Sequence, residues 1–161
     1  MEGVVDPGFW VGRRVFLTGH TGFKGSWLAL WLAELGAEVH GYSLPPPTRP
    51  SLFGEARVAA DLASDQRGDV RHRRRLARAL AAARPEVVLH LAAQPLVAEG
   101  LRDPVGTYAA NLMGTVHLLE AVRATPGVRA CLVVTSDKCY APRGRRPHRE
   151  GDPLGAPDPY G

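Results

Sequence analysis

The stretch Val15-Phe-Leu-Thr-Gly-His-Thr-Gly-Phe-Lys-Gly25 decides the fold of this chain. Its apolar start, Val15 to Leu17, is typical of a buried strand, and an apolar run at helical spacing begins at Trp27. Glycines at 19, 22 and 25 lie between the two, in the spacing G-x-x-G-x-x-G. This spacing is a relative of the dinucleotide-binding fingerprint, so we predict a strand, a phosphate-binding turn and a helix.

Each glycine has a physical task in this interpretation. Gly19 permits the tight turn out of the strand, Gly22 lets the backbone approach a pyrophosphate, and Gly25 lets helix and strand pack closely. The helix N-terminus then offers unpaired N–H groups and a partial positive charge to a phosphate. Three glycines alone are a weak signal, because a glycine-rich turn without a ligand has the same spacing. The flanking strand and helix favour the nucleotide site.

Strands and helices alternate along the rest of the chain. The predicted strands cover 14–18, 38–42, 64–70, 87–91 and 130–135, and the predicted helices cover 25–35, 73–83 and 104–124. Such alternation with short turns indicates an α/β fold with a doubly wound, Rossmann-like parallel sheet. In the first helix the large side chains recur at helical spacing and are predicted to face the core: Trp27, Leu28, Trp31, Leu32 and Leu35. At the end of the second strand, residues 42–44 (Tyr-Ser-Leu) replace the acid that usually binds the ribose, which leaves NAD and NADP both open.

The composition suits one domain with a sizeable core, since 45% of the 161 residues are hydrophobic. No apolar run approaches the ~20 residues of a membrane-spanning helix, and the acidic segment 1–6 lacks the basic start of a secretory signal. Two cysteines, Cys131 and Cys139, make neither a disulfide framework nor a metal site. We therefore expect a cytoplasmic protein without membrane contact and without a metal.

Arginines form two clusters, at 71–78 and 143–149, and the net charge is +4. Such clusters can bind nucleic acid or can form solvated surface. No aromatic residues interleave with the arginines to stack on bases, so we expect solvated surface and no nucleic-acid partner. A positive net charge also suits the binding of a negatively charged nucleotide substrate.

Two further turns are predicted at the same sheet edge as the glycine turn. Residues 92–95 follow the strand at 87–91, and 136–140 follow the strand at 130–135; in parallel sheets ligands bind beyond the carboxyl ends of strands. Ser136, Asp137 and Lys138 offer a hydroxyl, a carboxylate and an ammonium for proton transfer, although a polar turn without function has the same pattern. Tyr160 is either an acid/base whose pKa a nearby cation lowers or an ordinary aromatic. His20 and His90 are expected to be hydrogen-bonded packing residues.

Four runs of sequence carry a resemblance to a known family. They are VFLTGHTGFKGSWL at 15–28, HLAAQPLV at 90–97, TYAANLMGTVHLLEA at 107–121 and TSDKCY at 135–140. Together they resemble the CDP-glucose 4,6-dehydratases, a branch of the extended short-chain dehydrogenase/reductase family of nucleotide-sugar enzymes. The resemblance covers 10–160 and implies a Rossmann-like fold, NAD as cofactor and a nucleotide-sugar substrate, CDP-glucose.

The resemblance also implies a role for each matched residue. The NAD site would comprise Gly19, Gly22, Phe23, Lys24 and Gly25 at the pyrophosphate, Asp69 and Val70 at the adenine, Ala92, Ala93 and Gln94 at the nicotinamide, and the structural Asn111. Ser136 would bind the sugar 4-hydroxyl and Tyr160 would remove its proton. Asp137 would protonate the departing C6 hydroxyl, and Lys138 would occupy the C5 base position. NAD would take a hydride from C4 and return it to C6.

The chain departs from the family pattern at its end. Family members carry a lysine four residues after the catalytic tyrosine, whereas this chain stops at Gly161. We therefore expect residues 1–161 to be an incomplete, C-terminally truncated NAD-binding domain that lacks the substrate-binding region. Three alternatives stay open: a 4,6-dehydratase, a sugar-nucleotide epimerase, or a NAD-binding fragment without turnover. Asp137 and Lys138 disfavour the epimerase, which needs no acid for a leaving hydroxyl. The family resemblance is compatible with a homo-oligomer.

Overall fold

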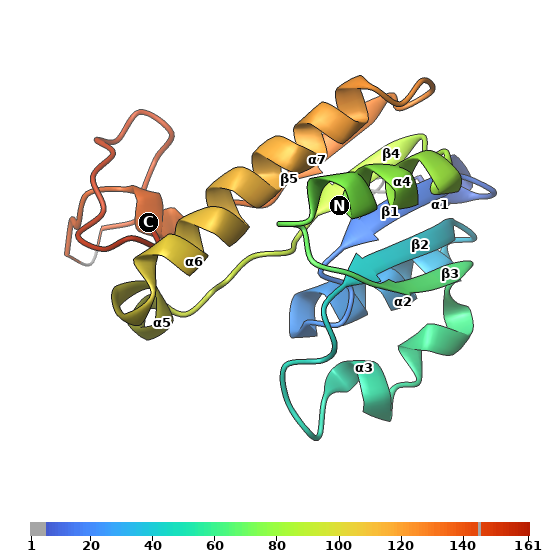
Figure 1. Ribbon diagram of the computed structural model, residues 1–161, viewed down its shortest axis with the longest axis horizontal. Coiled ribbons are helices and arrows are strands. Elements are labelled where there is room, and N and C mark those ends of the chain that lie inside the picture. Colours follow the sequence, from blue (N-terminus) through green and yellow to red (C-terminus); the bar gives the residue numbers. More distant parts are fainter. Residues whose placement is uncertain (1–5, 145) are drawn as a thin grey trace.

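The molecule is built around one five-stranded parallel sheet (Figure 1). The structure, a computed structural model, describes residues 6–144 and 146–161. The strands are β1 (Arg14–Thr18), β2 (Glu38–Ser43), β3 (Ser64–Arg67), β4 (Val87–His90) and β5 (Ala130–Val133), in the order β3-β2-β1-β4-β5. This order reverses direction between β1 and β4, as in doubly wound nucleotide-binding sheets. The predicted fold class is confirmed.

Helices cover both faces of the sheet (Figure 1). They are α1 (Pro7–Trp10), α2 (Phe23–Glu34), α3 (Leu52–Glu55), α4 (Arg73–Ala83), α5 (Val97–Arg102), α6 (Pro104–Tyr108) and α7 (Gly114–Arg123), with the 3₁₀ turns η1 (Val58–Asp61) and η3 (Asp137–Cys139) and the π-helical turn η2 (Ala109–Met113). The elements α2, α3 and η1 pack on one face of the sheet, and α4 and α7 pack on the other.

Alternate residues of the central strands enter two separate cores. In β1, Val15 and Leu17 lie with α2, whereas Phe16 lies with α4 and α7; none of the three is more than 1% exposed. All four residues of β4 are buried, as the continuous apolar run predicted. Each such side chain stabilises the fold by about 1.5–3 kcal/mol relative to leaving it in water. The two cores thereby hold the ends of β1 and β4 side by side.

The predicted strands and long helices are all present, and the short helices α1 and α3 were not predicted. Three further differences bear on the site. The third strand ends at Arg67, so 68–70 is a loop. The segment 97–102 forms another helix, α5, that was not predicted. The predicted helix at 104–124 is one run, α6–η2–α7, interrupted by a π-helical turn. Figure 1 shows this run extending past the sheet, with the C-terminal segment at its far end.

The predicted core face of α2 was wrong for its two tryptophans. Trp27 and Trp31 are 57% and 55% exposed, and the buried residues of α2 are instead Gly25, Ser26, Ala29 and Leu32. The physical reason is the close approach of α2 to the glycine turn, which only small side chains permit. Because the helix is apolar on nearly all sides, its periodicity could not identify the buried face.

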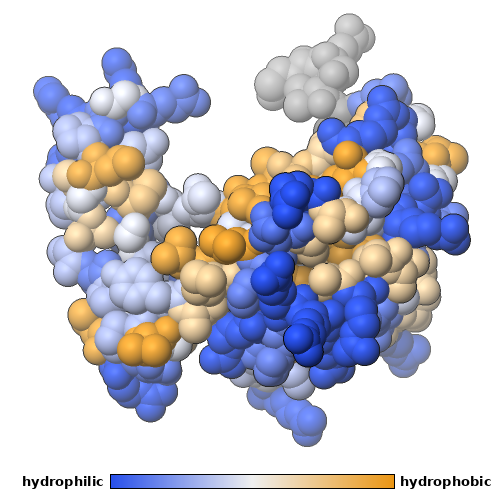
Figure 2. Space-filling model, turned by 45° about the horizontal axis from the view of Figure 1, so that its top comes forward, coloured by the Kyte–Doolittle hydropathy of each residue, from blue (hydrophilic) through white to orange (hydrophobic). Residues whose placement is uncertain are grey.

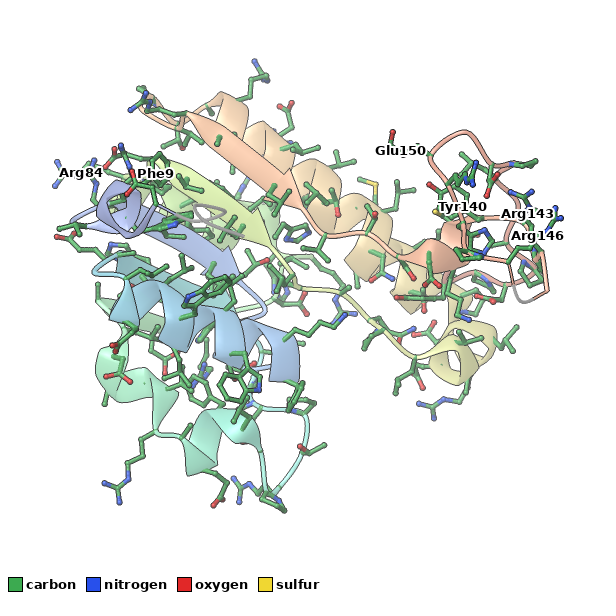
Figure 3. The ribbon with its side chains drawn as sticks, turned by 180° about the vertical axis from the view of Figure 1, so that it is seen from behind. Phe9, Arg84, Tyr140, Arg143, Arg146 and Glu150 are labelled. Atoms are coloured by element: carbon green, nitrogen blue, oxygen red, sulfur yellow. The ribbon has the colours of Figure 1, made fainter. Side chains whose placement is uncertain are left out.

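Two surfaces contain charged or apolar residues in unusual density. Figure 2 shows apolar side chains between the two lobes of this face. The exposed apolar residues of the α6–η2–α7 run include Leu112, Val116 and Leu119. Figure 3 shows Arg143 and Arg146 in the C-terminal loop, at the opposite end of the molecule from Phe9 and Arg84. Arg145 and the predicted N-terminal feature at 1–5 lie outside the described residues. No described helix is long and apolar enough to cross a bilayer.

Candidate nucleotide and catalytic site

The glycine turn after β1 is packed too closely for side chains at two of its three glycines. Gly19 has φ +77°, and a Cβ there would lie 2.7 Å from the backbone nitrogen of Ala92. A Cβ at Gly25 would lie 2.7 Å from the carbonyl carbon of Gly19 and closer still to its oxygen. At Gly22 the only neighbour is that oxygen at 3.4 Å, and φ is −76°, which any residue adopts. Two glycines are therefore required by packing, while the third leaves open space.

The N-terminus of α2 offers free donors beside that open space. Gly22 caps the helix without a side-chain hydrogen bond, and the first intrahelical bond runs from the Ser26 N–H to the Gly22 carbonyl. Within the described residues the N–H groups of Phe23, Lys24 and Gly25 have no acceptor. Phe23 is 71% exposed and Lys24 is exposed, whereas Gly25 is buried. Unpaired donors at a helix N-terminus are suited to bind a phosphate.

A buried histidine holds the glycine turn against the sheet. The His20 ring is fully buried, and it fills the space above Gly41, where a Cβ would lie 2.7 Å from three ring atoms. Its Nε2 lies 2.9 Å from Asp65 Oδ1, and Phe53 packs edge-on at 5.5 Å between ring centroids. Burial lowers the pKa of His20, against a smaller upward effect of Asp65. The expectation of a hydrogen-bonded packing residue is confirmed.

The adenine side of the predicted site carries an ion pair. Arg71 donates from its backbone N–H to Asp69 Oδ1 at 2.8 Å and from its Nε and Nη2 to Asp69 Oδ2 at 2.9 and 2.6 Å. These hydrogen bonds hold the pKa of the buried Asp69 below its usual range. Val70 is buried next to Gly114, where a Cβ would lie 2.6 Å from Val70 Cγ2. Asp69 and Val70 thus lie in the loop after β3, against the start of α7.

A chain of hydrogen bonds connects the end of β1 to the long helix. Thr18 Oγ1 accepts from the N–H groups of Leu91 and Ala92 and lies 2.6 Å from His90 Nδ1. Thr115 donates its hydroxyl hydrogen to the Asn111 carbonyl, so it accepts from His90 Nε2–H at 3.1 Å. His90 is therefore the Nε2–H tautomer, and burial lowers its pKa to about 4. Its predicted packing role is confirmed.

Asn111 fixes the turn after β4 from the π-helical turn. Its Oδ1 accepts from the Gln94 N–H at 2.7 Å and its Nδ2 donates to the Gln94 carbonyl at 3.0 Å. The Gln94 side chain donates in turn to Thr107 Oγ1 at 3.0 Å. A π-helical turn widens the helix locally and often accompanies a functional site. Ala92 and Ala93 precede Gln94 in this turn, and Ala93 is exposed.

The turn after β5 carries the candidate proton-transfer groups. Ser136 caps η3 by accepting from the Lys138 N–H at 3.2 Å, and the side chains of Asp137 and Lys138 are exposed. The half-buried Tyr160 lies near Gly100 and Gln94. A Cβ placed on Gly100 would lie 3.6 Å from Tyr160 Cβ and 3.8 Å from Gln94 Nε2. Gly161 packs against the Lys138 carbonyl, where a Cβ would lie 2.9 Å from the carbonyl carbon.

The structure brings the three predicted turns to one edge of the sheet. Among the described residues no hydrogen bond joins the hydroxyl groups of Ser136 and Tyr160. Sequence reasoning missed Thr18, Thr115 and Arg71, although a polar residue at the last position of an apolar strand was a usable signal for Thr18. The described residues contain no group of three or more His, Cys, Asp and Glu side chains that could hold a metal.

Two curated relatives of this chain are 4,6-dehydratases. The chain is 51% identical over 161 residues to the CDP-glucose 4,6-dehydratase of Salmonella typhimurium (strain LT2), a match that covers 98% of this chain and 44% of that protein. It is 37% identical over 121 residues to the GDP-mannose 4,6-dehydratase of Vibrio cholerae serotype O1, a match that covers 69% of this chain and 31% of that protein. The chain thus spans less than half the length of these curated relatives.

Solved structures share the fold. UDP-glucose 4-epimerase from Stenotrophomonas maltophila, with bound NAD and formylated UDP-arabinopyranose, superimposes with a TM-score of 0.79 at 26% identity, over 92% of this chain and 44% of that one. UDP-glucose 4-epimerase from Brucella ovis in complex with NAD superimposes with a TM-score of 0.78 at 27% identity. That match covers 92% of this chain and 43% of the epimerase chain. A family model for GDP-mannose 4,6 dehydratase matches residues 16–161. The chain belongs to this family of nucleotide-sugar 4,6-dehydratases and epimerases.

Proposed function

We propose that this chain forms the NAD-binding part of a nucleotide-sugar 4,6-dehydratase that acts on CDP-glucose. The observation that carries the proposal is the glycine turn: close packing at Gly19 and Gly25 opens the backbone at Gly22, beside three free N–H groups. Free backbone N–H groups beside a turn that has no side chain at Gly22 are suited to bind a pyrophosphate. The choice of NAD rests on the NAD-bound neighbours, and CDP-glucose rests on the relative from Salmonella.

In this proposal the chain's own residues divide into binding and positioning groups. The N–H groups at the start of α2, from Phe23 to Gly25, bind the pyrophosphate, and the glycines shape the turn. Asp69 and Val70 flank the adenine, with Arg71 keeping the Asp69 carboxylate ionised. The nicotinamide half is assigned to 92–94, which Asn111 holds in place through two hydrogen bonds to Gln94.

The chemical roles fall to the turn after β5 and to Tyr160. NAD, when bound, would take a hydride from sugar C4 and return it to C6. Ser136 binds the 4-hydroxyl and Tyr160 removes its proton. The resulting C4 ketone makes the C5 proton acidic. Lys138 takes this proton while Asp137 protonates the leaving C6 hydroxyl, which departs as water, and Lys138 returns the proton to C5 when the hydride adds at C6. The exposure of Asp137 and Lys138 supports roles that require contact with substrate. Residues 1–161 are assigned the cofactor domain, and the substrate-binding region is assigned to the remaining length of such enzymes.

The test is product analysis in a polypeptide that carries these residues together with the family's substrate-binding region. We expect CDP-glucose to lose one water, and Tyr160→Phe to abolish this turnover while NAD binding is retained. Tyr140→Phe is the matched control, because Tyr140 follows the same turn but stacks on His148 at 4.9 Å. Formation of a 4-epimer instead would establish the epimerase alternative. Unchanged turnover in Tyr160→Phe would refute the role of Tyr160.

A further inference from the structure

A hollow between α2 and η1 contains none of the residues assigned to the cofactor site. It has a volume of about 600 Å³ and is lined by Trp27, Leu30, Trp31, Ala33, Glu34 and Asp61. Five of these residues belong to α2 beyond its first turn, and Asp61 belongs to η1. The volume lies within the range of about 300–1,000 Å³ that is usual for small-molecule sites.

The hollow has a fixed wall because η1 is anchored against α2. Val58 at the start of η1 is fully buried, and it shares an apolar core with Ala29 and Leu32 on the inner side of α2. Leu62, directly after η1, packs against the same core. Asp61 lies between these two anchored positions, so its backbone is held beside α2 while the residue remains exposed.

Two indole side chains contribute to the wall of the hollow. Trp27 and Trp31 are four residues apart on α2, so they are neighbours on the helix surface, and they are 57% and 55% exposed. An indole ring carries negative potential over its faces and therefore attracts cations such as guanidinium and alkylated ammonium groups. Exposed indoles beside a hollow are thus suited to an organic cation.

The two carboxylates of the hollow have the charge that such a ligand requires. Glu34 and Asp61 are both exposed, and neither forms a salt bridge with another described residue. They place two negative charges at the hollow, although the chain as a whole has a net charge of +4. An anionic nucleotide is repelled by these charges, whereas a ligand with two positive groups neutralises them.

We propose that this hollow is a binding site for a small organic dication that carries guanidinium or alkylammonium groups. The positive groups pair with Glu34 and Asp61, and the rest of the ligand packs on the rings of Trp27 and Trp31. A neutral sugar can also stack on indole rings, but it leaves both carboxylates without a cation. The site is independent of the proposed cofactor and substrate, since both of those are anions.

The first test adds agmatine, which carries one guanidinium and one ammonium group, to the ¹⁵N-labelled chain and follows the indole N–H signals by NMR. The chain has three tryptophans, and the half-buried Trp10 lies outside the hollow, so it is an internal control. We expect saturable shifts of the Trp27 and Trp31 signals and no shift of the Trp10 signal. Butanediol and methyl glucoside are neutral and should leave all three signals unchanged. Added salt should weaken the binding of agmatine, because the paired charges are exposed.

The second test removes the charges and a ring by substitution. Glu34→Gln and Asp61→Asn should each raise the Kd for agmatine about two- to fivefold, as expected for exposed ion pairs, and the double variant should raise it about tenfold. Glu55→Gln, on α3 and outside the hollow, is the matched control and should leave the Kd unchanged. Trp31→Leu should raise the Kd about two- to fivefold, whereas Trp31→Phe keeps an aromatic face and should lose less affinity.

Four results would each overturn the proposal. They are unshifted signals of Trp27 and Trp31 with agmatine, equal binding of the neutral compounds, a wild-type Kd in the double variant Glu34→Gln/Asp61→Asn, and binding of an arginine-rich peptide without binding of agmatine. The last result would assign the hollow to a protein partner. The affinity for NAD should stay unchanged in all these variants, because none of the substituted residues belongs to the proposed cofactor site.

Discussion

Replacing Gly25 by alanine should destabilise the fold and weaken NAD binding together. The new Cβ would lie 2.7 Å from the Gly19 carbonyl carbon and 2.9 Å from His20 Cα, whereas contacts under 3.0 Å are essentially never seen. The obstructing atoms are backbone, so α2 must move outward by about 1 Å, and overpacking of this kind costs about 1–3 kcal/mol. For a chain of this size we expect the Tm to fall by about 2–12 °C.

The matched variant Gly22→Ala separates packing from binding. At Gly22 the nearest atom is 3.4 Å from the new Cβ and the backbone conformation suits alanine, so we expect the free energy of unfolding to change by less than about 1 kcal/mol. The added methyl group should nevertheless keep the pyrophosphate away from the helix N-terminus. In Gly25→Ala the displaced N–H groups lose their charge-assisted hydrogen bonds, each worth about 1.5–3 kcal/mol.

Urea denaturation and calorimetric titration with NAD measure the two effects. We expect both variants to raise the Kd for NAD at least tenfold and only Gly25→Ala to shift the urea midpoint. An unchanged midpoint in Gly25→Ala would refute the steric reasoning. Wild-type NAD affinity in Gly22→Ala would remove the glycine turn from the proposed cofactor site.

Three further predictions concern polar groups around the candidate site. Burial lowers the pKa of His90 from 6.5 to about 4, so between these pH values only the unfolded chain takes up the proton. The contribution of His90 to the free energy of unfolding is therefore complete above pH 6.5 and falls by up to about 3 kcal/mol as the pH approaches 4. His90→Gln should flatten this pH dependence in urea titrations from pH 4 to 7. A residual slope from His20, whose pKa burial also lowers, should remain. Asn111→Ala removes both hydrogen bonds to Gln94 and should cost about 1–3 kcal/mol in thermal unfolding, whereas Leu112→Ala, at the exposed neighbouring position, is the control and should cost less. Arg71→Ala should raise the pKa of Asp69 toward its usual range in a carboxyl NMR titration; an unchanged value would contradict the ion pair.

The sheet could be predicted because its signals are local. The apolar run of β4, the glycine turn after β1 and the periodicity of α4 each specify one element, and alternation of strands and helices limits the topology. The face of α2 could not be predicted in this way. Its orientation depends on how closely Gly25 approaches Gly19, which is a contact between backbones rather than a pattern of side chains.

The candidate site was accessible from sequence only in part. Ser136, Asp137 and Gln94 follow predicted strands, so their position at the carboxyl edge of the sheet could be predicted. Thr18 and Thr115 act through His90, and this chain of hydrogen bonds joins three distant parts of the sequence that no local pattern connects. The π-helical turn η2 was not predicted either, because a single continuous helix was expected over 104–124.

Gly41 and His20 occupy one volume between them, because the histidine ring fills the place of the side chain that Gly41 lacks. The effect of a substitution at either position therefore depends on the residue at the other. A library randomised at position 41 alone should return glycine, whatever selection is applied to it. Exchange of His20 for a small residue releases that restriction, so a side chain at 41 becomes acceptable only after the neighbour has changed first. The order of substitutions, and not merely their sum, decides which descendants of this turn still fold.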